Sequence, residues 1–269
     1  MAIERTIGFV GGCAITQPDI PKEKRFIEVL RTKMKSDCSI ETSFTFSSYS
    51  HFYELEKSIE KIINKQKVDL LIVHLRPQPL LVLSKFIIKK KNKNNKTAFF
   101  INPLVYRKCA YPYLEQSSSP VINQLALKPK SKPKLMGLNI LLGRLFGLNK
   151  KAAKQIFNAI LSIQSQCKQK DIKLTILGIS PQPMTKHGNI NCQELNVYLI
   201  KKCHDEGIEY VDSFSKMNNS DCFQEDELHL SEKGHEYLGD ILNEGIKHFT
   251  TPAANVNRKS EMLSGADVP

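Results

Sequence analysis

The sequence lacks the long apolar run that a membrane-spanning helix requires. No stretch of its 269 residues approaches the roughly 18 consecutive apolar residues of such a helix. Its first ten residues, MAIERTIGFV, also lack the basic segment followed by an apolar segment that is typical of a secretory signal peptide. We therefore expect a soluble cytoplasmic protein.

The cysteines lack any pairing pattern. Their number is odd, no two form a CxxC pair, and no spacing is typical of a zinc site. We therefore expect reduced thiols in a reducing compartment rather than a disulfide framework, and the sequence indicates no metal and no cofactor. The cysteines are Cys13, Cys38, Cys109, Cys167, Cys192, Cys203 and Cys222.

Aromatic residues are scarce in the two most basic segments. The net charge is +12, which is compatible with nucleic acid, an anionic membrane or an acidic protein as a partner. The basic segments KKKNKNNK, residues 89–96, and LKPKSKPK, residues 127–134, offer no aromatic side chains for base stacking. We therefore interpret them as a solvated helix end and a surface loop, and we do not expect nucleic-acid binding.

Short apolar runs alternate with longer segments of helical spacing. In residues 51–65, for example, apolar side chains recur at steps of three and four, and Ile156, Ile160, Ile163 and Cys167 repeat this spacing. This alternation predicts an α/β fold with a mostly parallel, doubly wound sheet. The predicted strands are residues 5–11, 39–46, 68–75, 97–101, 172–178 and 208–212.

The length and the 41% hydrophobic content fit a single domain, which we place at residues 1–249. Its last helix is predicted to begin near Ser231, a suitable N-cap. The proline-rich residues 103–150 are predicted to be an irregular insertion, such as a lid, a binding loop or a partner surface. The polar residues 250–269 are predicted to be disordered.

The segment DELHLSEKGH, residues 226–235, carries the strongest chemical pattern. Asp226, three residues before His229, can accept the proton of one imidazole nitrogen and leave the other nitrogen as a base. Such a base needs a nucleophile, and Cys13 follows the first strand in the sequence IGFVGGC. Gly11 and Gly12 allow a tight turn and close approach of backbone N–H groups to a substrate oxyanion, and a following helix would lower the thiol pKa. A Cys–His–Asp triad is chemically reasonable.

These motifs resemble those of the SGNH or GDSL-type hydrolases. GGCA resembles the first family block, Gly-Asp-Ser-Leu, with Cys13 at the nucleophilic serine, and DELHLSEKGH closely resembles the last block, with Asp226 and His229 as the acid and base. The resemblance covers about residues 6–249. It implies a three-layer α/β/α fold of flavodoxin-like topology and an acyl-transfer chemistry.

Two other family blocks differ from the family pattern. In DLLIVHLRPQP, Arg76 stands at the family's glycine and Gln78 at the asparagine that donates to the oxyanion. In FSSYSHF, Ser48 or Tyr49 would have to offer a backbone N–H in place of the oxyanion glycine. We therefore consider Gly12, Ser48, Arg76 and Gln78 as candidate oxyanion or substrate-binding residues, although a rigid solvent-facing turn explains Arg76 and Gln78 equally well.

Several other polar residues have simpler explanations. His74 is expected to pack in the core, and Cys192 and Asn196 are expected to be structural residues of a helix. His187 is expected on a surface loop after the strand at residues 172–178, where it could also line a pocket.

The most specific functional hypothesis is a cysteine-dependent acyltransferase or thioesterase acting on an acyl ester or thioester. A thioester intermediate is more reactive toward amines and thiols than an ester, so cysteine favours transfer over hydrolysis. The basic segments would suit an acidic acyl-carrier protein. Alternatives are an ordinary esterase or carbohydrate deacetylase that uses Cys13, a non-catalytic binding or scaffold protein of this fold and, less consistent with the sequence, a nucleic-acid binder.

Overall fold

A computed structural model describes most of the predicted sheet and its flanking helices. The described residues are 4–37, 41–48, 54–76, 87–91, 97–101, 148–181, 183, 186–217, 219–225 and 229–250.

The centre of the structure is a five-stranded, entirely parallel sheet. Its strands are β1 (Glu4–Gly11), β2 (Glu41–Ser48), β3 (Leu70–His74), β6 (Lys173–Leu177) and β7 (Glu209–Val211). They lie in the order β2-β1-β3-β6-β7, so the chain moves outward from β1 in one direction and then from β3 in the other. This order confirms the doubly wound, flavodoxin-like fold, and it places the topological switch between β1 and β3.

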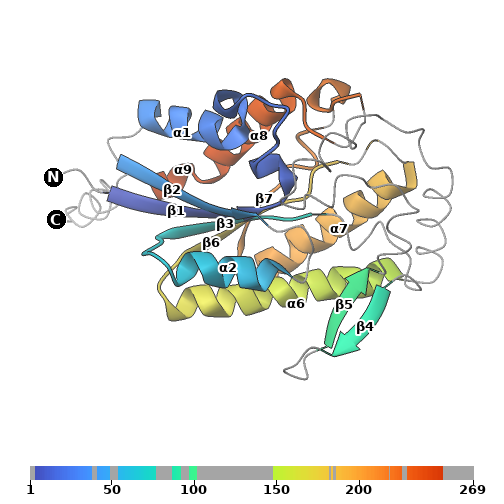
Figure 1. Ribbon diagram of the computed structural model, residues 1–269. Helices are drawn as coiled ribbons and strands as arrows, with labels where there is room; N and C mark the ends of the chain where they lie inside the picture. The colour runs from blue at the N-terminus through green and yellow to red at the C-terminus, as the bar shows by residue number, and fades with distance from the viewer. Residues whose placement is uncertain are drawn as a thin grey trace, which may run out of the picture.

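One face of the sheet is covered by α1 (Phe26–Asp37), α8 (Glu232–Gly245) and the short α9 (Lys247–Thr250). Figure 1 shows these helices together on one side of the strands. The predicted last helix is therefore confirmed, and Ser231 caps it as expected. The buried residues on this face include Ile7, Phe9, Phe26, Leu30, Ile72, Leu238 and Leu242.

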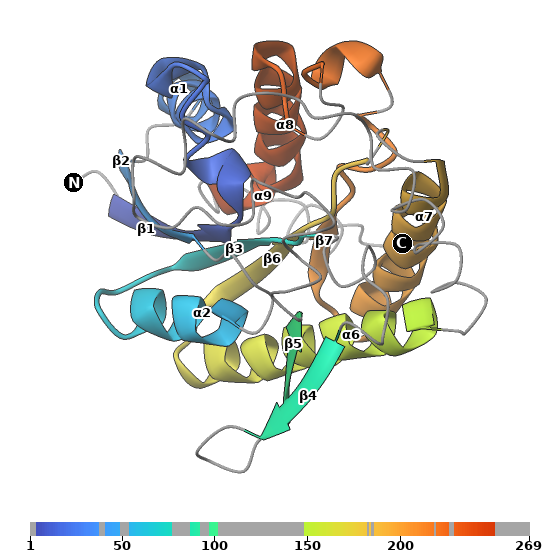
Figure 2. The ribbon, with the colours of Figure 1, turned by 45° about the vertical axis from the view of Figure 1, so that its right-hand side comes forward.

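The opposite face is covered by α2 (Leu55–Ile63), α6 (Leu148–Gln169) and α7 (Lys186–Asp205). Figure 2 shows all three on the side away from α1 and α8, which confirms the three-layer arrangement. Neighbouring strand residues point to opposite faces, so Leu71 and Val73 pack on this side while Ile72 packs on the other. The predicted apolar stripe is buried here: Ile156, Ile160, Ile163 and Cys167.

The run at residues 97–101 is a strand, but it does not belong to the central sheet. This strand, β5 (Thr97–Ile101), pairs antiparallel with β4 (Ile87–Lys91) in a separate two-stranded unit. The expected helix end in the basic segment 89–96 is therefore wrong, because its first three residues belong to β4. The β-branched pair at the start of β4 and the two phenylalanines of β5 favour strands over a helix.

The predicted insertion ends earlier than expected, because α6 already begins at Leu148. The rest of that insertion, residues 103–147, and the tail from residue 251 onward lie outside the described residues. The boundary of the single domain stays a prediction. Within the described part of the chain, no helix combines the length and apolar character needed to cross a bilayer.

Candidate active site

The candidate site lies at the edge of the sheet where the parallel strands end. Gly11, the last residue of β1, is paired with Ser48, the last residue of β2, and Arg76 follows β3 by two residues. Loops that follow β1 and β3 diverge at the switch point, where ligands bind in doubly wound sheets. The structure thus brings Gly12, Ser48 and Arg76 to one edge, as the sequence predicts.

The turn after β1, residues 11–15, is tightly packed against the end of β3. A β-carbon on Gly12 would lie 2.5 Å from Cδ and Nε of Arg76, and one on Gly11 would lie 3.1 Å from Cβ of His74. The backbone N–H of Ile15 donates to the carbonyl of Gly12 at 3.2 Å. The glycines therefore allow close packing, and Arg76 carries its positive charge directly beside this turn.

The helix expected to follow Cys13 is only the 3₁₀ turn Cys13–Ile15. The first α-helix, α1, begins at Phe26. A single 3₁₀ turn has no aligned dipole of useful size, so the condition for a helix effect on the thiol of Cys13 is not met.

The loop between Phe223 and Leu230, here called the His229 loop, is closed by backbone hydrogen bonds. The N–H of Gln224 donates to the carbonyl of His229 at 2.8 Å, and Phe223 forms an isolated antiparallel bridge with Leu230. Just outside the loop, the N–H of Ser231 donates to the carbonyl of Cys222 at 3.0 Å. These bonds hold residues 222–224 against residues 229–231, and the side chain of His229 is half-buried.

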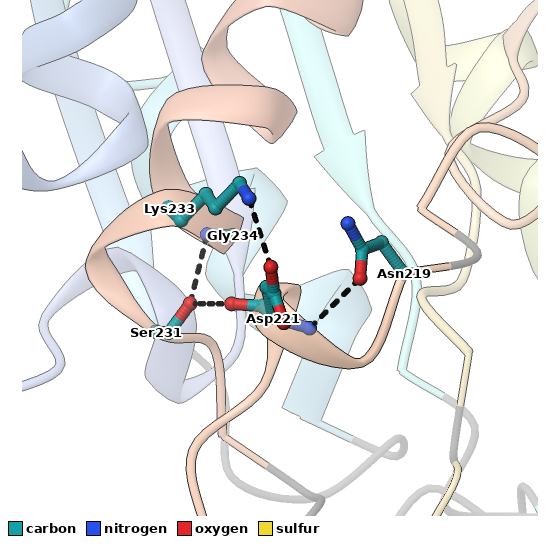
Figure 3. Close-up of polar contacts among 5 residues, drawn as sticks. All are labelled: Asn219, Asp221, Ser231, Lys233 and Gly234. Carbon is teal, nitrogen blue, oxygen red and sulfur yellow. Dashed lines mark hydrogen bonds and ion pairs between the residues drawn. The ribbon is translucent and has the colours of Figure 1, made fainter.

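The start of α8 is joined to the preceding 3₁₀ turn η6 (Ser220–Cys222) by the contacts in Figure 3. The hydroxyl of Ser231 donates to the carbonyl of Asp221 and accepts from the N–H of Gly234 at 3.1 Å. Lys233 forms an exposed ion pair with Asp221 at 2.9 Å, which lowers the pKa of that carboxyl. A β-carbon on Gly234 would lie 2.0 Å from the carbonyl oxygen of Cys222, so this position requires glycine.

The side chain of Gln17 joins the loop after β1 to the His229 loop. It is almost fully buried, and its Nε2 donates to the carbonyl of Leu230 at 2.9 Å. The same Nε2 donates to Asp19 at 3.3 Å, and Asp19 also accepts a hydrogen bond from the side chain of Gln224. The bonds from Gln17 to Leu230 and from Gln224 to Asp19 connect segments more than 200 residues apart, so they bring the chain around Cys13 to the chain around His229.

Two buried histidines stand beside this junction. Burial, with smaller contributions from the charges of Arg76 and His235, lowers the pKa of His74 to about 4. Burial likewise lowers the pKa of His235 to about 4, where Arg25 and His229 act in the same direction and Asp19 opposes them. The ring of Phe26 stacks on His235 at 5.9 Å and meets His74 edge-on at 6.1 Å. Both imidazoles are therefore neutral at physiological pH, and the expected packing role of His74 is confirmed.

The remaining candidate residues have different outcomes. The side chain of Cys13, and all atoms of Gln78 and Asp226, lie outside the described residues, so their roles stay predictions. Ser48 is exposed, and its carbonyl accepts a hydrogen bond from the hydroxyl of Ser58 at 3.4 Å. Its expected backbone donation to an oxyanion stays a prediction. Among the described residues, no group of three or more His, Cys, Asp or Glu could hold a metal ion.

The helix α7 settles three other expectations. Cys192 is fully buried, and Asn196 donates to Asp212 at 2.9 Å and accepts from the hydroxyl of Tyr210 at 2.7 Å. Their structural role is confirmed. The loop expected around His187 is wrong, because α7 already begins at Lys186.

The sequence analysis missed Gln17 and the role of His235. No local pattern marks Gln17, because its partners come from the other end of the chain. His235 did carry a signal, since it is the last residue of the quoted segment DELHLSEKGH. Its distance of six residues from His229 places it inside α8 rather than on the loop, which could have indicated a buried supporting role.

Comparisons with known proteins found one family match and several structures of similar fold. The family described as GDSL-like lipase/acylhydrolase has a model that matches residues 142–242, a segment that contains His229 but not Cys13. No curated protein matches the chain.

Several solved structures share the fold. A lipase/acylhydrolase from Enterococcus faecalis is similar with a TM-score of 0.55 and 11% identity, over 92% of this chain and 98% of that chain. A catalytic mutant of the acetylxylan esterase Axe2 from Geobacillus stearothermophilus has a TM-score of 0.54 and 8% identity, over 91% and 95%. The structure of TesA has a TM-score of 0.51 and 12% identity, over 91% and 99%.

At these identities the structures show a common fold and nothing finer. The family match adds sequence evidence for the segment that carries His229. The chain is therefore similar to GDSL-like lipases/acylhydrolases over residues 142–242, and it shares its three-layer fold with solved structures of such enzymes.

Proposed function

We propose that this protein is an acyl-transfer enzyme in which Cys13 is the nucleophile, His229 the base and Asp226 the residue that orients His229. The observation that carries the proposal is the buried hydrogen bond from Gln17 to the carbonyl of Leu230, at 2.9 Å. It joins the segment that follows Cys13 to the residue next to His229. The family and its structural neighbours are esterases and acylhydrolases, and this supports acyl chemistry.

The reaction would proceed in two steps. In the first, His229 takes the thiol proton of Cys13, the resulting thiolate attacks the carbonyl carbon of the acyl substrate, and His229 then protonates the leaving alkoxide or thiolate. A C–S bond forms and a C–O or C–S bond breaks. In the second, water, an amine or a thiol attacks the thioester, His229 takes the proton of that acceptor, and the proton returns to the sulfur of Cys13.

Arg76 supports an active rather than a vestigial site. Its side chain lies against Gly12, so its positive charge stands beside the predicted nucleophile and the predicted oxyanion. A nearby cation lowers the pKa of a thiol and stabilises negative charge on a tetrahedral intermediate. Arg76 would in this way replace part of the family's oxyanion block, together with the predicted donors Gly12, Ser48 and Gln78.

The proposed substrate is an acyl ester or thioester, and an acidic acyl-carrier protein would be complementary to the net charge of +12. We further propose a cytoplasmic location. Four of the cysteines, Cys167, Cys192, Cys203 and Cys222, are free and buried in the described part of the chain, which suits a reducing compartment.

The test is intact-mass spectrometry after brief incubation with p-nitrophenyl acetate or a short-chain acyl thioester. We expect one acyl adduct on the wild-type protein, located on the peptide that contains Cys13, and none on Cys13→Ala. The matched control is Cys222→Ala, which should form the adduct, because burial raises the pKa of the Cys222 thiol. Absence of an adduct and of turnover in the wild type would contradict the proposal and favour a non-catalytic binding protein.

A second measurement separates transfer from hydrolysis. Addition of an amine during turnover should give an amide in preference to the free acid if Cys13 favours transfer. Release of the free acid alone would instead indicate the ordinary esterase or deacetylase, an alternative suited to the similarity with an acetylxylan esterase.

A further inference from the structure

His229 lies on a loop, and a catalytic base on a loop needs an anchor relative to its nucleophile. The hydrogen bonds within the His229 loop join its two ends but do not set their distance from the turn after β1. That second requirement is met by side chains from outside the loop. One such bond reaches the carbonyl of Leu230, the residue that follows His229.

The bond to Leu230 is the end of a buried chain of three hydrogen bonds. The N–H of Phe26, at the start of α1, donates to Nδ1 of His235 at 3.2 Å. Nε2 of His235 lies 3.2 Å from Oε1 of Gln17, and Nε2 of Gln17 donates to the carbonyl of Leu230 at 2.9 Å. His235 is fully buried, and Gln17 is 1% exposed.

The direction of every bond in this chain is determined by its first member. A backbone N–H can only donate, so Nδ1 of His235 must accept and carry no proton. In a neutral imidazole the proton is then on Nε2, which donates to Oε1 of Gln17. The amide of Gln17 must therefore present its NH₂ to Leu230. In the flipped orientation, its NH₂ would face the N–H of His235 and its oxygen would face the carbonyl of Leu230, and neither pair could form a hydrogen bond.

This chain of hydrogen bonds requires a neutral His235, and the surroundings of His235 keep it neutral. Burial lowers the pKa of His235 to about 4. The charged and titratable groups that act on it are Arg25 and His229, which lower its pKa, and Asp19, which raises it. His74 lies close enough to have its own pKa lowered by His235.

We propose that Gln17 and His235 are positioning residues for His229: they hold the His229 loop against the turn that carries Cys13. The catalytic meaning of this inference rests on the proposed function, whereas the anchoring of the loop does not. His235 also accepts the N–H of Phe26 and so satisfies one of the unpaired donors at the start of α1. A test must separate this structural role from the positioning role.

Two substitutions at one position achieve that separation. The amide of His235→Gln places a donor where Nε2 of His235 stands, so it keeps the bond to Gln17 and loses the acceptor for Phe26. The amide of His235→Asn places an acceptor where Nδ1 stands, so it keeps the bond from Phe26 and loses the bond to Gln17. Gln17→Met, which is similar in size and has no donor, removes the last bond of the chain.

The first readout is amide hydrogen exchange at Gln224 and Ser231, whose N–H groups close the His229 loop. Exchange there should become roughly tenfold faster in His235→Asn and Gln17→Met, because a buried polar group loses its partner, and should stay near wild type in His235→Gln. Exchange at Phe26 should show the opposite pattern between the two His235 variants. Exchange at Ile72 in β3 should be unchanged in all of them, which excludes global unfolding.

The second readout is turnover of p-nitrophenyl acetate. We expect kcat to fall roughly 10- to 100-fold in His235→Asn and Gln17→Met at an unchanged KM, and His235→Gln to retain most of kcat. Equal protection of Gln224 and Ser231 in all variants would overturn the inference, as would equal losses in the two His235 variants. If the wild type itself forms no acyl adduct, the proposed function fails, and amide exchange alone decides whether Gln17 and His235 anchor the loop.

Discussion

The two sides of the candidate site differ in how far they depart from the family pattern. On one side, the His229 loop keeps the family's last block and is held by a buried chain of hydrogen bonds through Gln17 and His235. On the other, the end of β3 carries Arg76 where the family has glycine, and its side chain lies against Gly12. We call the first the retained side and the second the rebuilt side; in the proposed mechanism, the retained side positions the base and the rebuilt side stabilises the oxyanion with a cation.

The largest expected effect comes from a substitution of His229, on the retained side. His229→Ala should lower kcat/KM for p-nitrophenyl acetate by roughly 10³-fold, because it removes the proposed base of the triad. His248→Ala is the matched control, since His248 is exposed on α9 and pairs with Glu209 at 3.5 Å. The kcat/KM of His248→Ala should stay near that of the wild type, so the two variants should differ by roughly 10³-fold in steady-state kinetics. Equal activities would show that His229 is not the base.

The second effect compares the two buried histidines, His235 on the retained side and His74 on the rebuilt side. Both pKa values are about 4 in the folded protein, below the ordinary value of 6.5, so the unfolded chain binds more protons between these values. The free energy of unfolding should therefore fall as pH drops from about 6.5 to about 4, by roughly 3 kcal/mol for each histidine. Urea unfolding across this range measures the loss.

The same experiment has a built-in control. His235→Gln removes the titration of one histidine and keeps that of His74, so its pH dependence should be about half as steep. A pH dependence identical to that of the wild type would mean that His235 does not titrate on unfolding as described.

The third effect tests how tightly the retained side is packed. Gly234→Ala places a methyl group 2.0 Å from the carbonyl oxygen of Cys222, and backbone cannot yield as a flexible side chain does. We expect about 2 to 4 kcal/mol of lost stability, measured by chemical denaturation. The control Gly207→Ala meets no atom within 4 Å and bears only the strain of a φ of 63°, so it should cost about 1 kcal/mol.

The smallest effect concerns the rebuilt side. Arg76→Met removes the charge beside Gly12 and keeps much of the packing, so the pKa of His74 should rise, and alkylation of Cys13 at pH 7 should slow by roughly threefold. Arg76→Lys should preserve both properties. An NMR titration of His74 is the direct measurement, and an unchanged pKa would show that the guanidinium has no electrostatic role there.

The sequence alone correctly predicted features that depend on local residue patterns or on a motif within one segment. The apolar stripe from Ile156 to Cys167, the N-cap at Ser231 and the alternation of strands and helices follow from spacing and residue type, and the structure agrees with them. The hairpin formed by β4 and β5 was missed, because pairing between strands depends on partners that spacing does not name.

The site shows the same limit. The segment 226–235 is visible as a motif, whereas the link from Gln17 to Leu230 joins residues 213 positions apart and leaves no local trace. Likewise, the close packing of Arg76 on Gly12 depends on β1 and β3 being neighbours in the sheet, which no short segment reveals.

The central claim is that Cys13 reacts as a thiolate paired with His229. The pH dependence of its alkylation by iodoacetamide, followed on the Cys13 peptide by mass spectrometry, tests this most directly. The account predicts a midpoint well below the ordinary thiol pKa of about 8.5 in the wild type, and a shift upward toward that value in His229→Asn. A midpoint at or above about 8.5 in the wild type, unchanged in His229→Asn, would contradict it.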